Sequence, residues 1–189
     1  MTKRATSSGS TLRARALSKI PKAKEEKRVY FAYGSNLLLK QMRDRCPGYK
    51  LRGTAVLYNY RVVCNKVKSD GINYCAGLKK STGNKVLGAL YKLTPSDIKA
   101  LDVDEGCYAG TVHYYRDEKD FYVKNRETGE PVNAFTYFVA RPVTPKKPTL
   151  EYWEKIFQGC RDHNFPEEYV KNLRKWFLME PDKLQKRHR

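Results

Sequence analysis

The sequence predicts an α+β domain in which an antiparallel sheet curls or closes into a small β-barrel with flanking helices. Several β-rich segments follow one another between residues 54 and 140 with short turn sequences between them, and two helical segments come after them. The chain has 189 residues, which fits one domain with appendages and leaves no room for a two-enzyme fusion.

The body begins with a buried strand that runs into a tight turn and a helix. Residues 29–33 are apolar or aromatic, and Gly34 ends the run. Ser35 or Asn36 is expected to cap a helix that stops at residues 46–48, Cys-Pro-Gly. An apolar stripe on one side of this helix is expected to consist of Leu37, Leu38, Gln41, Met42 and Arg45.

The next part of the chain is rich in β-forming residues. Segments 54–64, 74–78 and 86–93 predict successive antiparallel strands. Turn sequences at 69–71 and 81–84 are expected to separate them.

A strong helix-start signal follows at residues 94–97, Thr-Pro-Ser-Asp. It combines a Thr cap, Pro at the first helical position and an acid at the third. Ile98 and Leu101 are expected to form the buried side of a short helix that ends near Gly106.

The remaining elements are three strands and two helices. Strands at 112–116 and 121–124 lead through a hairpin turn at 127–131 into a hydrophobic strand at 132–140. Beyond a Pro- and Lys-rich connector, two helices are expected to cover the sheet, over 150–161 and 166–178.

The net charge of +18 is concentrated in the tails. Residues 1–28 hold nine basic and two acidic side chains, and residues 183–189 hold four basic and none acidic. We therefore expect a basic N-terminal tail over 1–28, a domain over 29–178 and a basic C-terminal tail over 179–189. A nucleic-acid-binding module is the alternative, although the sequence has no RNP-like, KH or zinc-finger signature.

Composition also bounds the compartment and the metal chemistry. The five cysteines are an odd number without short spacings, which favours reduced thiols and a cytoplasmic protein. The first 24 residues contain Arg, Lys and Ser but no acid, so mitochondrial import is an alternative. With three histidines and no recognisable ligand spacing, no metal site is expected. No apolar run is long enough to span a bilayer.

Two motifs are candidates for chemistry. The turn at residues 33–36, Tyr-Gly-Ser-Asn, lets the backbone approach a ligand and presents N–H groups that can bind an anion, although a plain capped helix start is the alternative. The second motif places Asp102, Asp104 and Glu105 in the last turn of a helix. There they meet the negative end of the helix dipole and one another, so at least one should have a raised pKa. A solvated acidic corner is the alternative.

Taken together, these motifs resemble the γ-glutamylcyclotransferase family. The resemblance covers about residues 29–178 and depends on the order and spacing of the motifs. The segments that carry the resemblance are residues 33–37, residues 101–106, Tyr137 within Phe-Thr-Tyr-Phe, and the stretch from Tyr152 to the Phe-Pro-Glu-Glu-Tyr of residues 165–169.

The resemblance implies a small barrel with flanking helices and a cofactor-independent intramolecular reaction. The α-amine of a γ-glutamyl group attacks its own γ-carbonyl, which closes 5-oxoproline and releases an amine or amino acid. On the family's pattern Glu105 is the catalytic acid and base, and Asp102 and Asp104 are expected to be solvated. The substrate-binding residues that the pattern implies are Tyr33, Gly34, Ser35, Asn36, Leu37, Tyr137 and Tyr152.

Several matters stay open at this stage. After its Glu-Gly the family often has a Gly and then a Tyr two residues later, whereas here Gly110 is followed by Thr111 and Val112, with Tyr114 and Tyr115 further downstream. The leaving group is not identified, and glutathione is disfavoured because glutathione-specific relatives carry another residue in place of Asn36. The oligomeric state, a homodimer included, is open, as is non-specific polyanion contact through the tails. A relative of the same fold with another cyclisation or amide chemistry, or with a binding role alone, is a further alternative.

Overall fold

The computed structural model describes residues 28–68, 70–107, 113–117 and 121–178, so the expected tails lie outside the described residues except for Arg28, which begins β1. Five strands form one antiparallel sheet in the order β1-β3-β2-β5-β6, and β4 pairs with β7 in a second sheet. The elements in chain order are β1 (Arg28–Ala32), the 3₁₀ helix η1 (Ser35–Leu37), α2 (Leu39–Arg45), β2 (Lys50–Val67), β3 (Tyr74–Leu93), α3 (Pro95–Asp104), β4 (Tyr114–Asp117), β5 (Tyr122–Asn125), β6 (Pro131–Asn133), β7 (Thr136–Val139), α4 (Leu150–Asp162) and α5 (Glu167–Leu178).

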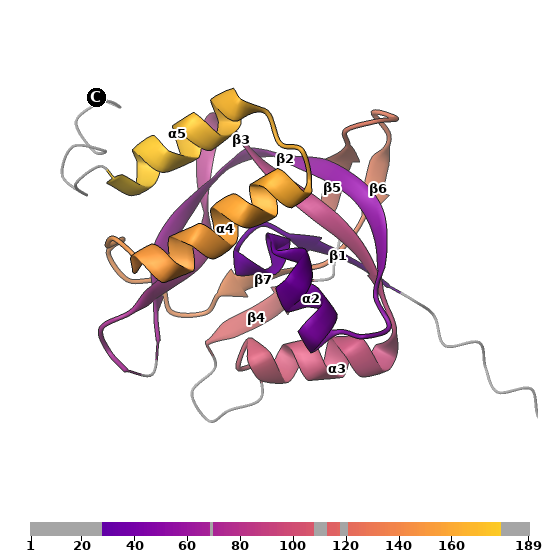
Figure 1. Ribbon diagram of the computed structural model, residues 1–189, viewed down its shortest axis with the longest axis horizontal. Coiled ribbons are helices and arrows are strands. Elements are labelled where there is room, and N and C mark those ends of the chain that lie inside the picture. The colour runs from indigo at the N-terminus through magenta and orange to yellow at the C-terminus, as the bar shows by residue number, and fades with distance from the viewer. Residues whose placement is uncertain (1–27, 69, 108–112, 118–120, 179–189) are drawn as a thin grey trace, which may run out of the picture.

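A long hairpin of β2 and β3 is the frame of the domain. Figure 1 shows the two ribbons curving together across the molecule, with α4 and α5 on one side of them. The loop between them is closed by Asp70, whose Oδ1 accepts hydrogen bonds from the backbone N–H groups of Ile72 and Asn73. The turn expected at 69–71 is therefore confirmed for its described residues.

The turn expected at 81–84 is wrong, because β3 continues through it. The register of β2 and β3 shifts at this point, which marks a β-bulge. Asn59 and Gly83 both adopt positive φ angles of 61° and 77°, and the Gly83 N–H donates to Asn59 Oδ1 over 3.2 Å. The turn-forming residues bend the strand without ending it, since β2 pairs with β3 on both sides of the bulge.

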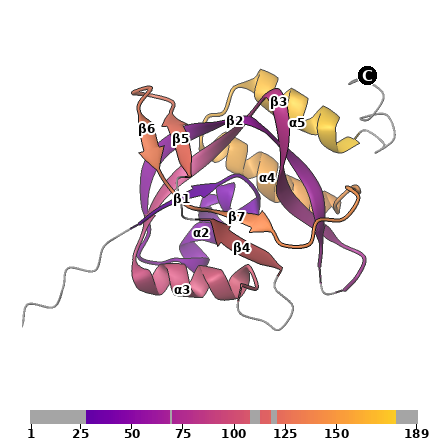
Figure 2. The same cartoon turned by 180° about the vertical axis from the view of Figure 1, so that it is seen from behind.

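The α+β class is confirmed, whereas the word barrel applies only loosely. The five-stranded sheet does not close, since β1 and β6 are its edges. The single strand expected over 132–140 is divided at Phe135, which donates to Val29 O and accepts from Phe31 N–H, both over 2.8 Å. Phe135 is hydrogen-bonded to β1 between the end of β6 in the first sheet and the start of β7 in the second sheet. Figure 2 shows β1, β7 and β4 together from behind.

The helix start expected at residue 94 is confirmed. Thr94 Oγ1 accepts from the Asp97 N–H over 3.1 Å, and the Asp97 carboxylate accepts from the Thr94 N–H over 3.1 Å. The capping box satisfies two of the N–H donors that have no acceptor within the helix, which fixes where α3 begins. Ile98 and Leu101 are buried, as expected.

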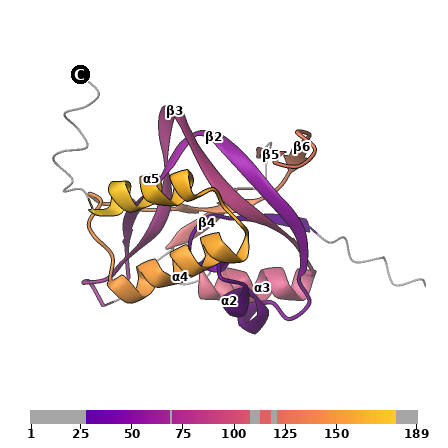
Figure 3. The ribbon, with the colours of Figure 1, turned by 45° about the horizontal axis from the view of Figure 1, so that its top comes forward.

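The two C-terminal helices pack on the same side of the hairpin (Figure 3). Gly159 lets α4 pack directly on η1, because a Cβ atom there would lie 2.4 Å from Leu37 Cβ. Ile156 is fully buried on α4, and Leu173 is buried on α5. Both helices thus agree with the expected positions, and α4 fixes the segment that follows β1.

Candidate active site

A small pocket lies where the turn after β1, the end of α3 and the first turn of α4 meet. It encloses about 290 Å³, open solvent at its mouth included. The residues that line it are Tyr30, Tyr33, Gly34, Ser35, Asn36, Ala76, Glu105, Tyr114, Tyr137 and Tyr152. Seven of these come from the segments that the sequence singled out, and Tyr30, Ala76 and Tyr114 are additions.

The turn after β1 supplies one wall of the pocket with its backbone. A Cβ atom on Gly34 would lie 3.3 Å from Ala76 Cβ and 3.5 Å from the Tyr152 hydroxyl, so a side chain here would crowd the pocket. The first N–H groups of η1, those of Ser35 and Asn36, have no acceptor within the helix. They are the donors that this wall can offer to a ligand.

The single capped helix expected after Gly34 is wrong. The chain forms η1 first, and α2 begins at Leu39 with Leu38 at its N-cap. The cap comes from another helix instead, since Asp162 Oδ2 on α4 accepts from the Leu39 N–H over 3.1 Å. The side chains expected to cap the helix are engaged elsewhere. Ser35 Oγ accepts from Gln41, and the amide of Asn36 reaches Glu105.

Asn36 connects the turn to the acidic motif. Its Nδ2 donates to Glu105 Oε1 over 3.0 Å and to the Tyr30 hydroxyl over 3.1 Å. Its Oδ1 accepts from Gln41 Nε2 and from Arg45 Nη1, both over 2.9 Å. Because every polar group of this buried side chain is used, the amide is held in one orientation.

Glu105 ends α3 as its C-cap and directs its carboxylate into the pocket. Its own N–H donates to Leu101 O over 2.9 Å, and Gly106 with φ of 70° ends the helix after it. The side chain is only 15% exposed, and burial raises the pKa of its carboxyl above the usual 4.5. Arg45, 3.3 Å away, and the Asn36 amide act in the other direction and lower this pKa, but they do not cancel the effect of burial.

The expectation that Asp102 is solvated is wrong. Its side chain is 4% exposed and accepts from the Tyr137 hydroxyl over 2.7 Å and from Arg116 Nη1 over 2.5 Å. It faces β4 and β7, the second sheet, and anchors the end of α3 there. Asp104 is solvated as expected, with 40% exposure and a 3.4 Å contact to Arg45 Nε.

Tyrosine side chains form most of the remaining wall. The Tyr114 hydroxyl donates to Ala76 O over 2.7 Å, and the Tyr152 hydroxyl accepts from the Ala76 N–H over 2.9 Å. The Tyr33 hydroxyl donates to Tyr137 O over 2.7 Å. Burial raises the pKa of Tyr33, Tyr114 and Tyr152 well above 10, so the wall is neutral. These contacts hold the rings rigidly around the carboxylate of Glu105.

Sequence reasoning missed Gln41 and Arg45 as parts of the site. Both lie on the stripe that was expected to be apolar, four residues apart, and polar side chains within such a stripe are a signal of a buried network. Tyr114 was treated as displaced from the family's pattern, yet it lines the pocket.

One residue of the expected site does not line the pocket. Leu37 is buried in the core with its N–H bonded to Gly34 O and its carbonyl bonded to His163, so it does not line the cavity. Residues 110–112, the departure from the family's pattern, lie outside the described residues.

All five cysteines are free thiols. Among the described residues, no group of three His, Cys, Asp or Glu side chains is placed to hold a metal ion. None of the described helices combines the length and the apolar content that crossing a membrane requires.

Comparison with known proteins points to the same family as the motifs. The sequence pattern of the family described as "Gamma-glutamyl cyclotransferase, AIG2-like" matches residues 30–155. The chain is 28% identical to "Gamma-glutamylcyclotransferase" of Mus musculus over 150 residues, which is 77% of each chain. It is 26% identical to the Homo sapiens protein of that name over 154 residues, which is 79% of each chain. A solved structure described as "Gamma-glutamyl cyclotransferase" is similar with a TM-score of 0.71 and 26% identity, over 82% of this chain and 89% of that one.

Proposed function

The chain belongs to the gamma-glutamyl cyclotransferase, AIG2-like family, and we propose that it is an enzyme that cyclises a γ-glutamyl group to 5-oxoproline. The reaction releases the amino acid or amine that the γ-carbonyl held. The proposal goes beyond family membership, because a fold hosts more than one activity. Its main support is a buried carboxylate of raised pKa in a small pocket beside a glycine turn.

The reaction needs one group that moves a proton twice. The Glu105 carboxylate first takes a proton from the substrate's α-ammonium, which frees the electron pair that forms the new C–N bond to the γ-carbonyl. It then gives that proton to the amide nitrogen while the old C–N bond breaks. The leaving amine takes up the second proton that the ring nitrogen loses, so Glu105 ends as a carboxylate. A raised pKa suits this double role.

The other residues position the substrate and the carboxylate. The N–H groups of Ser35 and Asn36 are the proposed donors for the substrate's charged or developing oxygens, at a wall that Gly34 keeps open. Tyr33, Tyr137 and Tyr152 enclose the glutamyl chain. A five-membered ring closes readily once its ends are held in reach, so orientation and proton transfer are what the protein must supply.

The size and polarity of the pocket favour this activity over nucleic-acid binding. The pocket is small and is lined by tyrosines, a glycine turn and one carboxylate, which suits a small polar ligand. The carboxylate of Glu105 would repel a phosphate group in the pocket, because both are negatively charged.

The test is release of 5-oxoproline by the full chain from γ-glutamyl dipeptides. The matched control is the α-glutamyl isomer of each dipeptide, whose γ-carboxyl carries no leaving group. We expect catalysed release from the γ isomers alone. A rate no higher than that without protein, over a panel of γ-glutamyl amino acids and amines, would contradict the proposal.

A further inference from the structure

Two lysines stand over tyrosine rings that line the pocket. Lys66 Nζ lies 5.8 Å from the centre of the Tyr114 ring, and Lys68 Nζ lies 5.8 Å from the centre of the Tyr152 ring. Lys66 belongs to β2, and Lys68 follows directly after the end of that strand. Both side chains are partly buried, so the rings and the strand hold them in place.

Neither ammonium forms an ion pair within the described part of the chain. The charge of Lys68 lowers the pKa of two acidic side chains, Asp70 and Glu151. The Asp70 carboxylate already accepts three hydrogen bonds in its own turn, and Glu151 pairs with Lys155 over 3.0 Å. The two positive charges are therefore available to a ligand.

Lys66 also acts on the interior of the pocket. Its charge is among those that lower the pKa of Glu105. Lys66 is therefore close enough to act electrostatically on the reacting carboxylate, although Lys66 is not one of the residues that line the pocket. A ligand that extends from Glu105 outward past Tyr114 and Tyr152 would meet both lysines.

We propose that Lys66 and Lys68 bind a carboxylate on the leaving group and so select γ-glutamyl conjugates of α-amino acids over γ-glutamyl conjugates of uncharged amines. This rests on the proposed function, which places the glutamyl end at the turn and at Glu105. The leaving group is then the part of the substrate that faces the pocket mouth. Neutral tyrosine walls cannot distinguish a carboxylate from an amide there, whereas two ammonium groups can.

The experiment compares two substrates that differ only in this charge, γ-glutamyl-alanine and γ-glutamyl-alaninamide. The measured quantity is the ratio of their kcat/KM values for 5-oxoproline release. A ratio is needed because loss of Lys66 also changes the pKa of Glu105, which affects both substrates alike. We expect the wild-type protein to favour the carboxylate by about tenfold, and Lys66→Gln/Lys68→Gln to bring the ratio near one.

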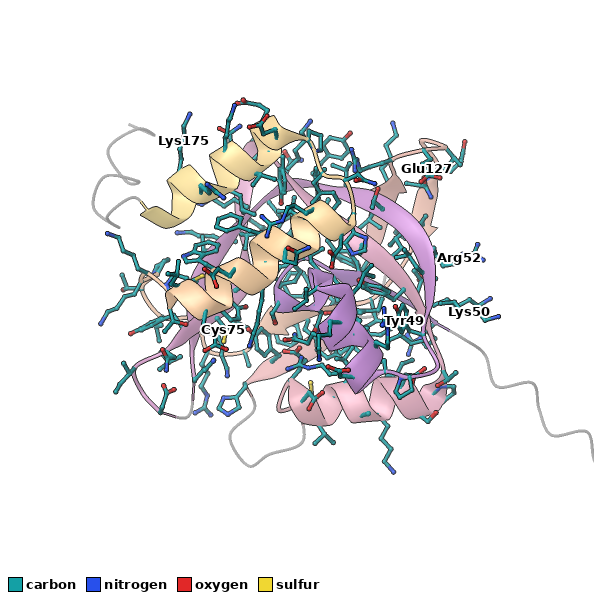
Figure 4. The ribbon with its side chains drawn as sticks, in the orientation of Figure 1. Tyr49, Lys50, Arg52, Cys75, Glu127 and Lys175 are labelled. Atoms are coloured by element: carbon teal, nitrogen blue, oxygen red, sulfur yellow. The ribbon has the colours of Figure 1, made fainter. Side chains whose placement is uncertain are left out.

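The matched control is Lys50→Gln/Arg52→Gln, which removes two charges at the same spacing from the other end of β2 and should keep the wild-type ratio. Figure 4 labels Lys50 and Arg52 far across the molecule from Cys75, the residue that pairs with Lys66 between strands. If the double lysine variant does not fold, the wild-type ratio measured at rising salt replaces it, since salt should reduce a preference that depends on charge.

Binding separates this proposal from the proposed function. Calorimetry of both ligands is done on Glu105→Gln, with and without the two lysine substitutions. A wild-type ratio near one, or a ratio that survives loss of both lysines, overturns the role of the lysines. If no 5-oxoproline forms but binding still favours the carboxylate through the lysines, the cyclisation fails and the anion site stands. If neither release nor a lysine-dependent binding preference is found, both proposals fail.

Discussion

Asp102 and Glu105 lie three residues apart at the end of α3, yet their carboxylates have very different partners. The two oxygens of Asp102 each have a separate close donor, Tyr137 at 2.7 Å and Arg116 at 2.5 Å. Both contacts of Glu105 go to one oxygen and are longer, 3.0 Å to Asn36 and 3.3 Å to Arg45. Arg45 is moreover shared with Asp104 and with the Asn36 carbonyl.

The comparison shows how one helix end can carry a structural acid and a reactive one. Asp102 is compensated by a cation and a hydroxyl, which ties α3 to the second sheet. Glu105 is buried with weaker compensation, so its charged form is costly and its pKa is raised. The first arrangement stabilises the fold, while the second keeps a carboxyl ready to exchange a proton.

The sharpest test of the reactive side is Glu105→Gln. The substitution keeps the size of the side chain, and the amide oxygen of Gln can still accept a hydrogen bond from Asn36, but the ionisable group is lost. Turnover should fall by at least about a hundredfold, the contribution that general acid and base catalysis typically makes. The Kd of a γ-glutamyl ligand, measured by calorimetry, should change little if the backbone of the turn holds the glutamyl end. Retention of most of the wild-type rate would show that Glu105 does not carry the proton.

The structural side is tested by Asp102→Asn. An amide can still accept from Tyr137 but no longer compensates Arg116, whose side chain is 25% exposed. Urea unfolding should show a loss of about 2 kcal/mol, less than for a fully buried pair because water reaches Arg116. Asp44→Asn is the control. Asp44 pairs with Lys40 on the surface of α2 with 61% exposure, and its loss should cost less than about 0.5 kcal/mol. Equal losses would mean that Asp102 does not anchor α3.

Much of this comparison could be predicted from the sequence, because the relevant signals are local. The cap at Thr94, the end of the helix near Gly106 and the three acids between them follow from residue types at fixed spacings. The Tyr-Gly-Ser-Asn turn and its place after a buried strand were predicted in the same way.

The contrast between the acids could not be predicted, because it depends on partners distant in the sequence. Arg116 and Tyr137 reach Asp102 from the second sheet, whose strand β7 is separated from β6 at Phe135. The bulge that replaces the expected turn at 81–84 likewise depends on pairing with β2. Local residue types fix where a helix ends. Long-range packing decides which acid at that end has its negative charge compensated by a cation and a hydrogen-bond donor.

Arg45→Gln tests whether the weak compensation of Glu105 sets its proton affinity. Arg45 lowers the pKa of Glu105, so removing its charge should raise that pKa further. Glu105 must begin the reaction as a carboxylate, and activity is therefore lost as pH falls through its pKa. The acid limb of the kcat/KM profile should move to higher pH in the variant, and the loss of rate should be greatest on the acid side. A uniform loss at every pH would assign Arg45 a purely structural role.

The smallest expected effect is that of Asp104→Asn, which should shift the pKa of Glu105 in the direction opposite to Arg45→Gln. Asp104 raises the pKa of Glu105 and also holds Arg45 Nε at 3.4 Å. Its loss removes a negative charge near Glu105. It also removes one partner of Arg45, whose remaining partners are Asn36 and Glu105. Both effects lower the pKa of the Glu105 carboxyl. The acid limb should shift to lower pH, with the rate near neutral pH within about twofold of wild type, because water screens a side chain that is 40% exposed. The shift should shrink as salt is added. Opposite shifts in Arg45→Gln and Asp104→Asn are the result expected when two charges of opposite sign act on the group that titrates. Shifts of the same sign would place the titrating group elsewhere, and Glu105 would lose its assignment as the proton carrier.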